Sequence, residues 1–147
     1  MGTSTRGEEE FLKLLRCYHI ETIIDVRSFP QSRLEHFKKD NLTKKLKTEG
    51  INYIYLGKEL GGFRKGGYLS YTKTAPYEEG ISRLMQIGKQ GVTAFICAER
   101  FPWKCHRRFI AASLEERGWR VEHIIEENRV WQPKITGPDV TLKAKFS

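Results

Sequence analysis

Hydrophobic residues recur with two different spacings along this chain. In residues 7–19 the apolar side chains recur three and four positions apart behind a run of glutamates, which is typical of an amphipathic helix. Residues 21–27 instead hold a short apolar run rich in β-branched side chains, which predicts a buried strand. Segments with helical spacing and short apolar runs then alternate along the chain. Further helices are expected at 41–49, 76–88 and 109–116, and further strands at 51–56, 92–97 and 119–125.

Helices that alternate with buried strands indicate a parallel sheet covered on both faces. The predicted fold is therefore α/β, a three-layer Rossmann-like domain with a mainly parallel sheet. Residues 1–131 are expected to form this single domain, and residues 132–147 an extended basic C-terminal tail. The glycine- and tyrosine-rich stretch 57–74 is expected to be a loop, and a loop of that length is usually functional or disordered.

Composition narrows the class of protein. An apolar content of 39% with 12% aromatic residues argues against a disordered chain. No apolar run approaches the roughly 20 residues of a membrane span, and the N-terminus lacks a signal pattern, so a cytoplasmic protein without a membrane partner is expected. The three cysteines then suit thiols, ligands or core positions better than disulfides. A net charge of +8 permits an anionic small molecule or nucleic acid as partner without choosing between them.

Three chemically dense loops each follow a predicted strand. They are residues 25–33, 57–62 and 97–108. Because parallel strands end at the same edge of a sheet and ligands bind there, we expect these loops to converge on one site. The candidate residues are Arg27, Ser28, Arg33, Glu59, Gly61, Gly62, Glu99, Cys105, His106 and Arg107.

The arginines point to anion binding, because their planar donors suit phosphate. Arg27, Arg33 and Arg107 would hold the anion, and the hydroxyl of Ser28 and the backbone of Gly61 and Gly62 could add contacts. A general acid or base is expected at Glu99 or, less favoured, at Glu59, with His106 carrying protons. Each residue also has a structural alternative, such as an ion pair or a tight turn.

The cysteines of the third loop leave two interpretations open. Cys97 ends an apolar strand, which favours a buried, inert thiol. Cys105 lies near a predicted helix N-terminus beside basic residues, so it would be a nucleophile if exposed and a packing residue otherwise. Zinc is disfavoured, because Cys97, Cys105 and His106 supply at most three ligands and neighbours on a helix point apart. No metal site is therefore expected, and the cofactor stays unknown.

Three motifs carry a family resemblance. They read Asp25-Val-Arg-Ser-Phe-Pro-x-Ser-Arg33, Leu56-Gly-x-Glu-Leu-Gly-Gly62 and Cys97-Ala-Glu-x-x-Pro-x-x-Cys-His-Arg107. In this order and spacing the chain resembles the uncharacterised family catalogued as domain of unknown function 488. The resemblance implies a compact α/β domain, mostly prokaryotic and cytosolic, and no particular activity.

Members of that family usually open with a strand that ends in Gly-His-Ser-x-Arg. Here Gly2-Thr-Ser-Thr-Arg6 matches the end of that motif, with Thr3 in the place of the histidine. The resemblance therefore implies that the family's first strand is lacking, and it gives no histidine for catalysis at that position.

The leading functional hypothesis is a small enzyme-like domain with an anion pocket, for phosphate, nucleotide or nucleic acid, at the C-terminal edge of its sheet. One alternative is a non-catalytic nucleic-acid-binding module. A further alternative is a thiol-dependent or sulfur-transfer enzyme that uses Cys105. The sequence indicates neither the reaction nor the oligomeric state.

Overall fold

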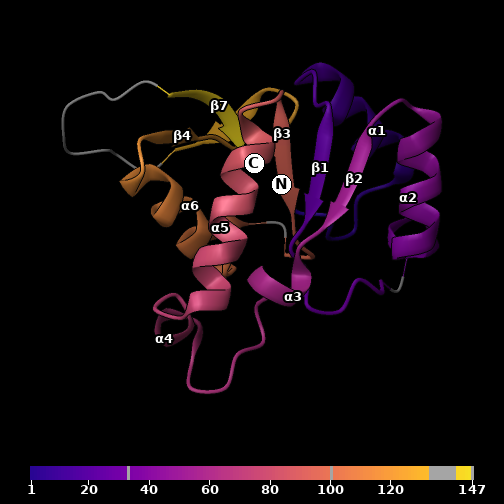
Figure 1. The fold of residues 1–147 in the computed structure, drawn as a ribbon. Helices are drawn as coiled ribbons and strands as arrows, with labels where there is room; N and C mark the ends of the chain where they lie inside the picture. The colour runs from indigo at the N-terminus through magenta and orange to yellow at the C-terminus, as the bar shows by residue number, and fades with distance from the viewer. Residues whose placement is uncertain (33, 100, 133–141, 147) are drawn as a thin grey trace.

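A parallel sheet forms the centre of the molecule. The computed structural model describes residues 1–32, 34–99, 101–132 and 142–146. In that part of the chain β1 (Thr22–Asp25) pairs with β2 (Asn52–Tyr55) on one side and with β3 (Thr93–Ile96) on the other, all parallel (Figure 1). All residues of β1 and β3 are buried, which is typical of a parallel sheet covered on both faces. The predicted α/β fold class is confirmed.

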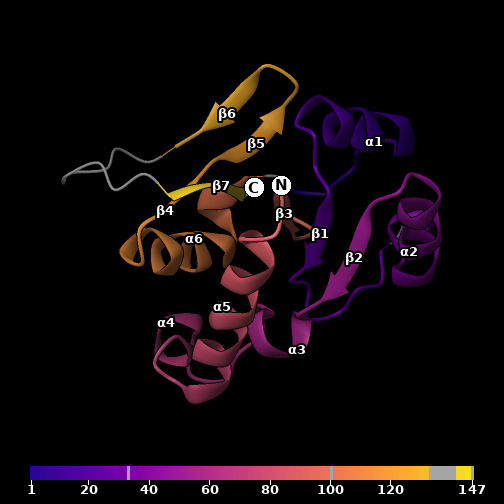
Figure 2. The same ribbon diagram turned by 45° about the horizontal axis from the view of Figure 1, so that its top comes forward.

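Helices cover the two faces of this sheet. On one side lie α1 (Glu8–Cys17) and α2 (Lys39–Thr48), the latter entered through the short 3-10 turn η1 (Glu35–Phe37). On the other side lie α5 (Ala75–Gly88) and α6 (Arg107–Glu116) (Figure 2). Because successive strand residues face opposite sides, Ile23 packs with α1 and α2 whereas Ile24 packs with α5 and α6.

The edge of the sheet beyond β3 is occupied by residues 1–4. Gly2 bridges to Cys97 in parallel, and the amides of Thr3 and Ser4 donate to the carbonyls of Cys97 and Ala98, each at 2.8 Å. The position of the strand predicted to be lacking is thus taken by this short extended segment. It holds the start of the chain directly against the loop that follows β3.

The stretch 57–74 is more ordered than the sequence suggested. It contains the single-turn helices α3 (Gly57–Leu60) and α4 (Tyr68–Tyr71), so the prediction of a plain loop was wrong. Leu60 and Tyr68 are buried in the core beside α5 and α6, and the Tyr68 hydroxyl donates to the Leu60 carbonyl at 2.8 Å. Such short helices depend on tertiary packing, which periodicity in sequence does not reveal.

The C-terminal strands also differ from prediction. The single strand expected at 119–125 is split at Glu122 into β4 (Trp119–Val121) and β5 (His123–Glu126). β5 turns back as a hairpin with β6 (Arg129–Trp131), while β4 pairs in parallel with β7 (Leu142–Phe146). Within the expected tail, residues 142–146 are thus extended and paired, and 133–141 lie outside the described residues. No helix in the described part of the chain is both long and apolar enough to cross a membrane.

Candidate functional site

A pocket of about 430 Å³ opens at the carboxyl ends of β1 and β3. Its walls come from residues 27–29 after β1, 62–63 after α3, and 97–99 and 104–106 after β3. The three loops predicted to converge therefore do meet at this edge. The pocket has the size of sites that bind small molecules.

His106 is the residue that joins these loops. Its Nε2 lies 3.0 Å from the carbonyl oxygen of Val26, at the end of β1. Because a carbonyl only accepts hydrogen bonds, this contact assigns the ring proton to Nε2 and leaves the Nδ1 lone pair free. Nδ1 faces two sulfur atoms, Cys105 Sγ at 3.5 Å and Cys97 Sγ at 3.8 Å.

Cys105 and His106 point the same way, contrary to the prediction that they diverge on a helix. The loop passes through the 3-10 turn η2 (Pro102–Lys104), and α6 begins only at Arg107. Cys105 therefore has an extended backbone, with φ −134° and ψ 155°, and His106 caps the helix. This local geometry turns both side chains toward Cys97. The ligand atoms of the three residues all lie within 4.8 Å of one another.

A buried arginine lies beneath Cys105. Arg107 has 0% of its surface exposed, and its Nε donates to Cys105 Sγ at 3.4 Å. Its backbone amide also donates to this sulfur at 3.5 Å, and a terminal nitrogen donates to the Glu99 carbonyl. A buried guanidinium requires a negative partner. Among the described residues, the Cys105 sulfur is the group in contact with it that can become an anion.

The surroundings of the two thiols shift their pKa values in opposite directions. The neighbouring Cys97 thiol lowers the pKa of Cys105 most, Arg107 adds to this effect, and the pKa falls well below its ordinary value despite burial. The neighbouring Cys105 sulfur and burial raise the pKa of Cys97 far above its ordinary value. Of the two sulfurs, Cys105 is therefore the one favoured to carry a negative charge.

The comparison with known families agrees with the motifs in these loops. The model of the family described as Domain of unknown function DUF488 matches residues 8–114, which include β1 to β3 and the loops around the pocket. The chain belongs to the DUF488 family. No curated protein and no solved structure matches the chain significantly. The function of this DUF488 domain must therefore be argued from its geometry.

The arginines proposed as an anion clamp are bonded within the DUF488 domain itself. Arg27 is buried and forms hydrogen bonds with both carboxylate oxygens of Asp25, at 2.8 and 2.7 Å, and with the Phe37 carbonyl at 2.7 Å. Arg107 lies beneath Cys105, as described above. Both guanidinium groups thus have partners within the protein, Arg27 a buried carboxylate and Arg107 a buried sulfur, although Arg27 also lines the pocket. Arg33 lies outside the described residues.

The glycine pair allows the loops of the DUF488 domain to approach closely. A Cβ atom on Gly62 would lie 2.7 Å from His106 Nδ1, and one on Gly61 would lie 2.3 Å from Ser28 Oγ. Ser28 accepts a hydrogen bond from the Phe63 amide at 3.2 Å. The predicted contribution of these residues to the site is thus visible as loop packing, while a contact with substrate stays a prediction.

The two candidate carboxylates lie in different places. Glu99 is exposed at the mouth of the pocket, where its carboxylate accepts from the Phe101 amide at 3.4 Å. Glu59 is half-buried on α3, and its Cβ would contact a side chain placed at Gly80 of α5. The structure therefore brings Glu99, but not Glu59, to the pocket.

Sequence reasoning missed several residues of this site in the DUF488 domain. Cys97 is only 8% exposed, as expected of a core residue, yet its sulfur faces the pocket. Its place at the end of a strand was the signal that could have found it. At the rim, Phe29 and Phe63 are 71% and 79% exposed with ring centroids 5.6 Å apart, and Lys104 lies nearby on the pocket wall.

Proposed function

We propose that this DUF488 protein is a small enzyme in which the Cys105 thiolate attacks an electrophilic substrate bound in the pocket. The observation that carries the proposal is the contact of Cys105 Sγ with Arg107 Nε at 3.4 Å beneath the pocket. A buried cation that donates to a sulfur stabilises the thiolate, which is the nucleophilic form. A further donor, the Arg107 backbone amide, lies 3.5 Å from the same sulfur.

Each group around the pocket has a role in this reaction. The Cys105 sulfur bonds to the electrophilic atom, and the leaving group departs with the electron pair of the broken bond. The leaving group takes up a proton from solvent at the pocket mouth, and the Glu99 carboxylate there accepts the proton of the water that attacks in the second step. In the second step water or another acceptor attacks the covalent adduct, and Cys105 leaves as the thiolate. His106 Nδ1, 3.5 Å from that sulfur, takes any proton that the thiol carries before the attack.

The substrate in this proposal is a small anion. Lys104 is exposed on the wall of the pocket, close to the N-terminus of α6, where the helix dipole favours negative charge. The overall charge of +8 also favours the approach of an anionic substrate. A phosphorylated metabolite, a nucleotide or a carboxylate of similar size fits a volume of about 430 Å³.

Alkylation of the native, chelator-treated protein tests the nucleophile. Iodoacetamide is neutral and iodoacetate is anionic, so the ratio of their rates reports on both the thiolate and the charge of its surroundings. Cys17 on α1 is exposed and serves as the reference thiol in the same molecule. We expect Cys105 to be labelled at least tenfold faster than Cys17 at pH 6, with a relative preference for iodoacetate that falls in Lys104→Gln. Labelling is followed by mass spectrometry of peptides.

Two results would overturn the proposal. If Cys105 is labelled no faster than Cys17 while the fold is intact, the thiolate is not available for attack. If the ratio of iodoacetate to iodoacetamide rates is the same at both cysteines, the substrate is not an anion. Cys105→Ser provides the control that assigns the labelled peptide.

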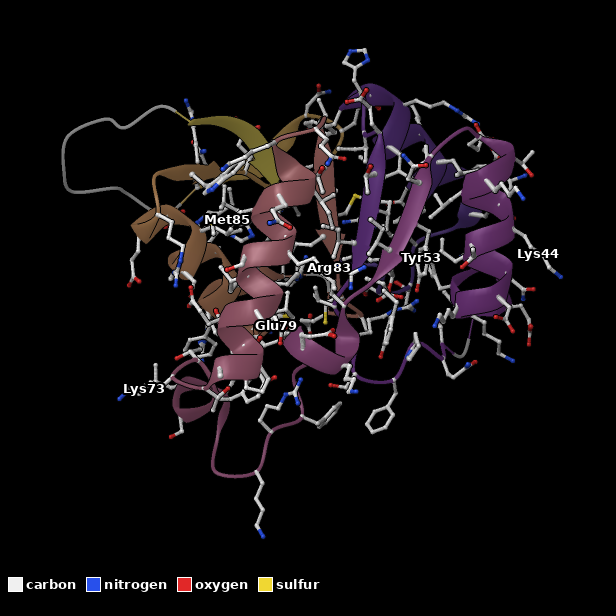
Figure 3. All side chains as sticks on the ribbon, viewed as in Figure 1. Lys44, Tyr53, Lys73, Glu79, Arg83 and Met85 are labelled. Carbon is white, nitrogen blue, oxygen red and sulfur yellow. The ribbon has the colours of Figure 1, made fainter. Side chains whose placement is uncertain are left out.

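Nucleic-acid binding through the basic surface is the less favoured alternative. Lys44 on α2 and Lys73 beyond α4 are exposed on opposite sides of the molecule (Figure 3). Lys38 and Lys45 form ion pairs with Glu35 and Glu8. These four lysines, two on opposite sides of the molecule and two held in ion pairs, do not together present one basic face to a phosphate backbone. A steep fall of oligonucleotide affinity with salt that survives Cys105→Ser would favour this alternative.

A further inference from the structure

We propose that Cys97, Cys105 and His106 form a binding site for a thiophilic divalent metal, with Zn²⁺ as the natural candidate, and that the fourth coordination position faces the pocket. This inference goes beyond the proposed thiol chemistry, because it needs Cys97 and His106 as well as Cys105. The two thiols and one imidazole are donors of the kind that zinc prefers.

The positions of the donor atoms match a tetrahedral centre. With Zn–S bonds of about 2.3 Å and a Zn–N bond of about 2.0 Å, a tetrahedral angle places sulfur and nitrogen about 3.5 Å apart. His106 Nδ1 lies 3.5 Å from Cys105 Sγ and 3.8 Å from Cys97 Sγ. All three ligand atoms fall within 4.8 Å of one another. The two nitrogen–sulfur distances therefore suit a bound metal with shifts of a few tenths of an ångström, and the two sulfurs would take up the separation of about 3.8 Å that a tetrahedral centre needs.

The neighbours of these atoms are those that support a metal ligand. The Val26 carbonyl holds the proton on Nε2 of His106, so that Nδ1 presents its lone pair to the two sulfurs. Such an outer hydrogen bond is the usual partner of a ligating histidine. Two N–H groups of Arg107 donate to Cys105 Sγ, which compensates the charge of a coordinating thiolate. Binding would displace the proton of Cys97.

The open fourth position indicates a reactive rather than a purely structural site. Structural zinc sites are closed by four protein ligands, whereas reactive ones keep one position for water or substrate. In the described residues the group has three members, and each of them lines the pocket of about 430 Å³. The ligand that completes the tetrahedron would come from the pocket. Water, a carboxylate, a phosphate oxygen or a substrate thiolate has the required chemistry.

Metal binding and alkylation should exclude each other, because both use the lone pairs of the Cys105 sulfur. This competition separates the present inference from the proposed function. A metal-free protein with fast labelling at Cys105 but no metal affinity keeps the thiol chemistry and overturns the metal site. If instead the protein binds metal but Cys105 of the metal-free protein is labelled slowly, the metal site stands and the proposed thiol chemistry is overturned.

Titration with Co²⁺ and then Zn²⁺ tests the site directly. The reduced, chelator-treated protein is titrated with Co²⁺, whose thiolate charge-transfer and tetrahedral d–d absorption bands report the ligands, and Zn²⁺ is then added to displace it. We expect one equivalent to bind, with bands typical of two thiolates. Saturating Zn²⁺ should slow iodoacetamide labelling of Cys105 at least tenfold.

Single substitutions identify the ligands. Cys97→Ser, Cys105→Ser and His106→Gln should each weaken Zn²⁺ binding by at least a hundredfold, whereas Cys17→Ser on α1 should leave it unchanged. Circular dichroism of each metal-free variant confirms that it is folded. The inference is overturned if the wild-type protein binds Zn²⁺ no more tightly than the Cys97→Ser variant does. It is also overturned if Cys17→Ser weakens Zn²⁺ binding as much as the substitutions of the three proposed ligands.

Discussion

At the scale of single residues, the site depends on what Gly62 lacks. A Cβ atom there would lie 2.7 Å from Nδ1 of His106, and the ring has little room to retreat because its Nε2 is bonded to the Val26 carbonyl. The absence of one methyl group thus permits the imidazole to lie between two loops and face both sulfurs.

Gly62→Ala should therefore displace His106. We expect a loss of about 1–3 kcal/mol in the free energy of unfolding, as for other overpacked sites, and at least a tenfold change in the labelling rate of Cys105. Gly7→Ala is the matched control, because nothing lies within 4 Å of its Cβ position and its φ is −68°. Urea denaturation and alkylation kinetics are the measurements. Equal behaviour of the two variants would show that the close approach has no consequence.

The residue scale also marks the limit of sequence reasoning at the site. Topology was enough to predict that the loops carrying Ser28, Gly62 and His106 converge. It was not enough to predict that Cys105 and His106 point together, since this depends on the backbone angles of one residue between η2 and α6. Nor did it predict that Arg27 and Arg107 neutralise buried groups, because the position of a guanidinium is set by tertiary contacts.

At the scale of elements, the end of β1 is fixed by the ion pair between Asp25 and Arg27. Both side chains are buried, and the Tyr53 hydroxyl of β2 donates to the same carboxylate at 2.6 Å. The guanidinium also reaches the Phe37 carbonyl in η1. The pair therefore ties the sheet to the segment that leads into α2.

Arg27→Met should destabilise the protein by about 3–5 kcal/mol, because it leaves the Asp25 carboxylate buried without its cation. The double variant Asp25→Asn/Arg27→Met should recover part of this loss, which urea denaturation of both proteins would measure. If instead the single variant unfolds like the wild type but loses its preference for iodoacetate, Arg27 serves the substrate and not the fold.

The helices and strands also show which parts of the fold can be predicted from the periodicity of hydrophobic residues in the sequence. Seven elements are long enough for a hydrophobic pattern to be recognised, and they lie close to the predicted positions. They are the helices α1, α2, α5 and α6 and the strands β1 to β3. α3 and α4 have four residues each, too few for a period. The β5–β6 hairpin was missed although Glu127-Asn128, between its strands, is a turn of suitable length and composition.

At the scale of the whole molecule, stability should depend on the protonation of His123. This residue of β5 is 1% exposed, and within the described part of the chain neither ring nitrogen has a hydrogen-bond partner. Burial lowers the pKa of His123 to about 3, and the nearby Met1 amino group and Arg107 add to this, while Cys105 opposes it. A histidine in the unfolded chain has a pKa of about 6.5.

Between these two values the unfolded chain binds more protons than the folded one, so stability falls as the pH falls. The contribution of His123 is a loss of about 1.5 kcal/mol between pH 6.5 and pH 5. His123→Phe keeps a ring against Trp131 and removes the titrating group. The free energy of unfolding of the wild type should decline more steeply with acid than that of the variant. Parallel profiles would mean that His123 takes up protons equally in the folded and the unfolded chain, so that burial does not lower its pKa.

The exposed aromatic pair at the rim has a consequence for chemical probes. Phe29 and Phe63 come from two different loops, and they stand at the entrance to a pocket whose floor holds two sulfurs and an imidazole. A synthetic probe with a flat apolar tail can therefore contact the two rings while a soft electrophile or metal-binding group reaches the sulfurs and the imidazole. An aryl-linked haloacetamide or hydroxamate combines these parts. Libraries of compounds that combine an apolar tail with such a reactive or metal-binding group offer a direct way to find ligands of this pocket.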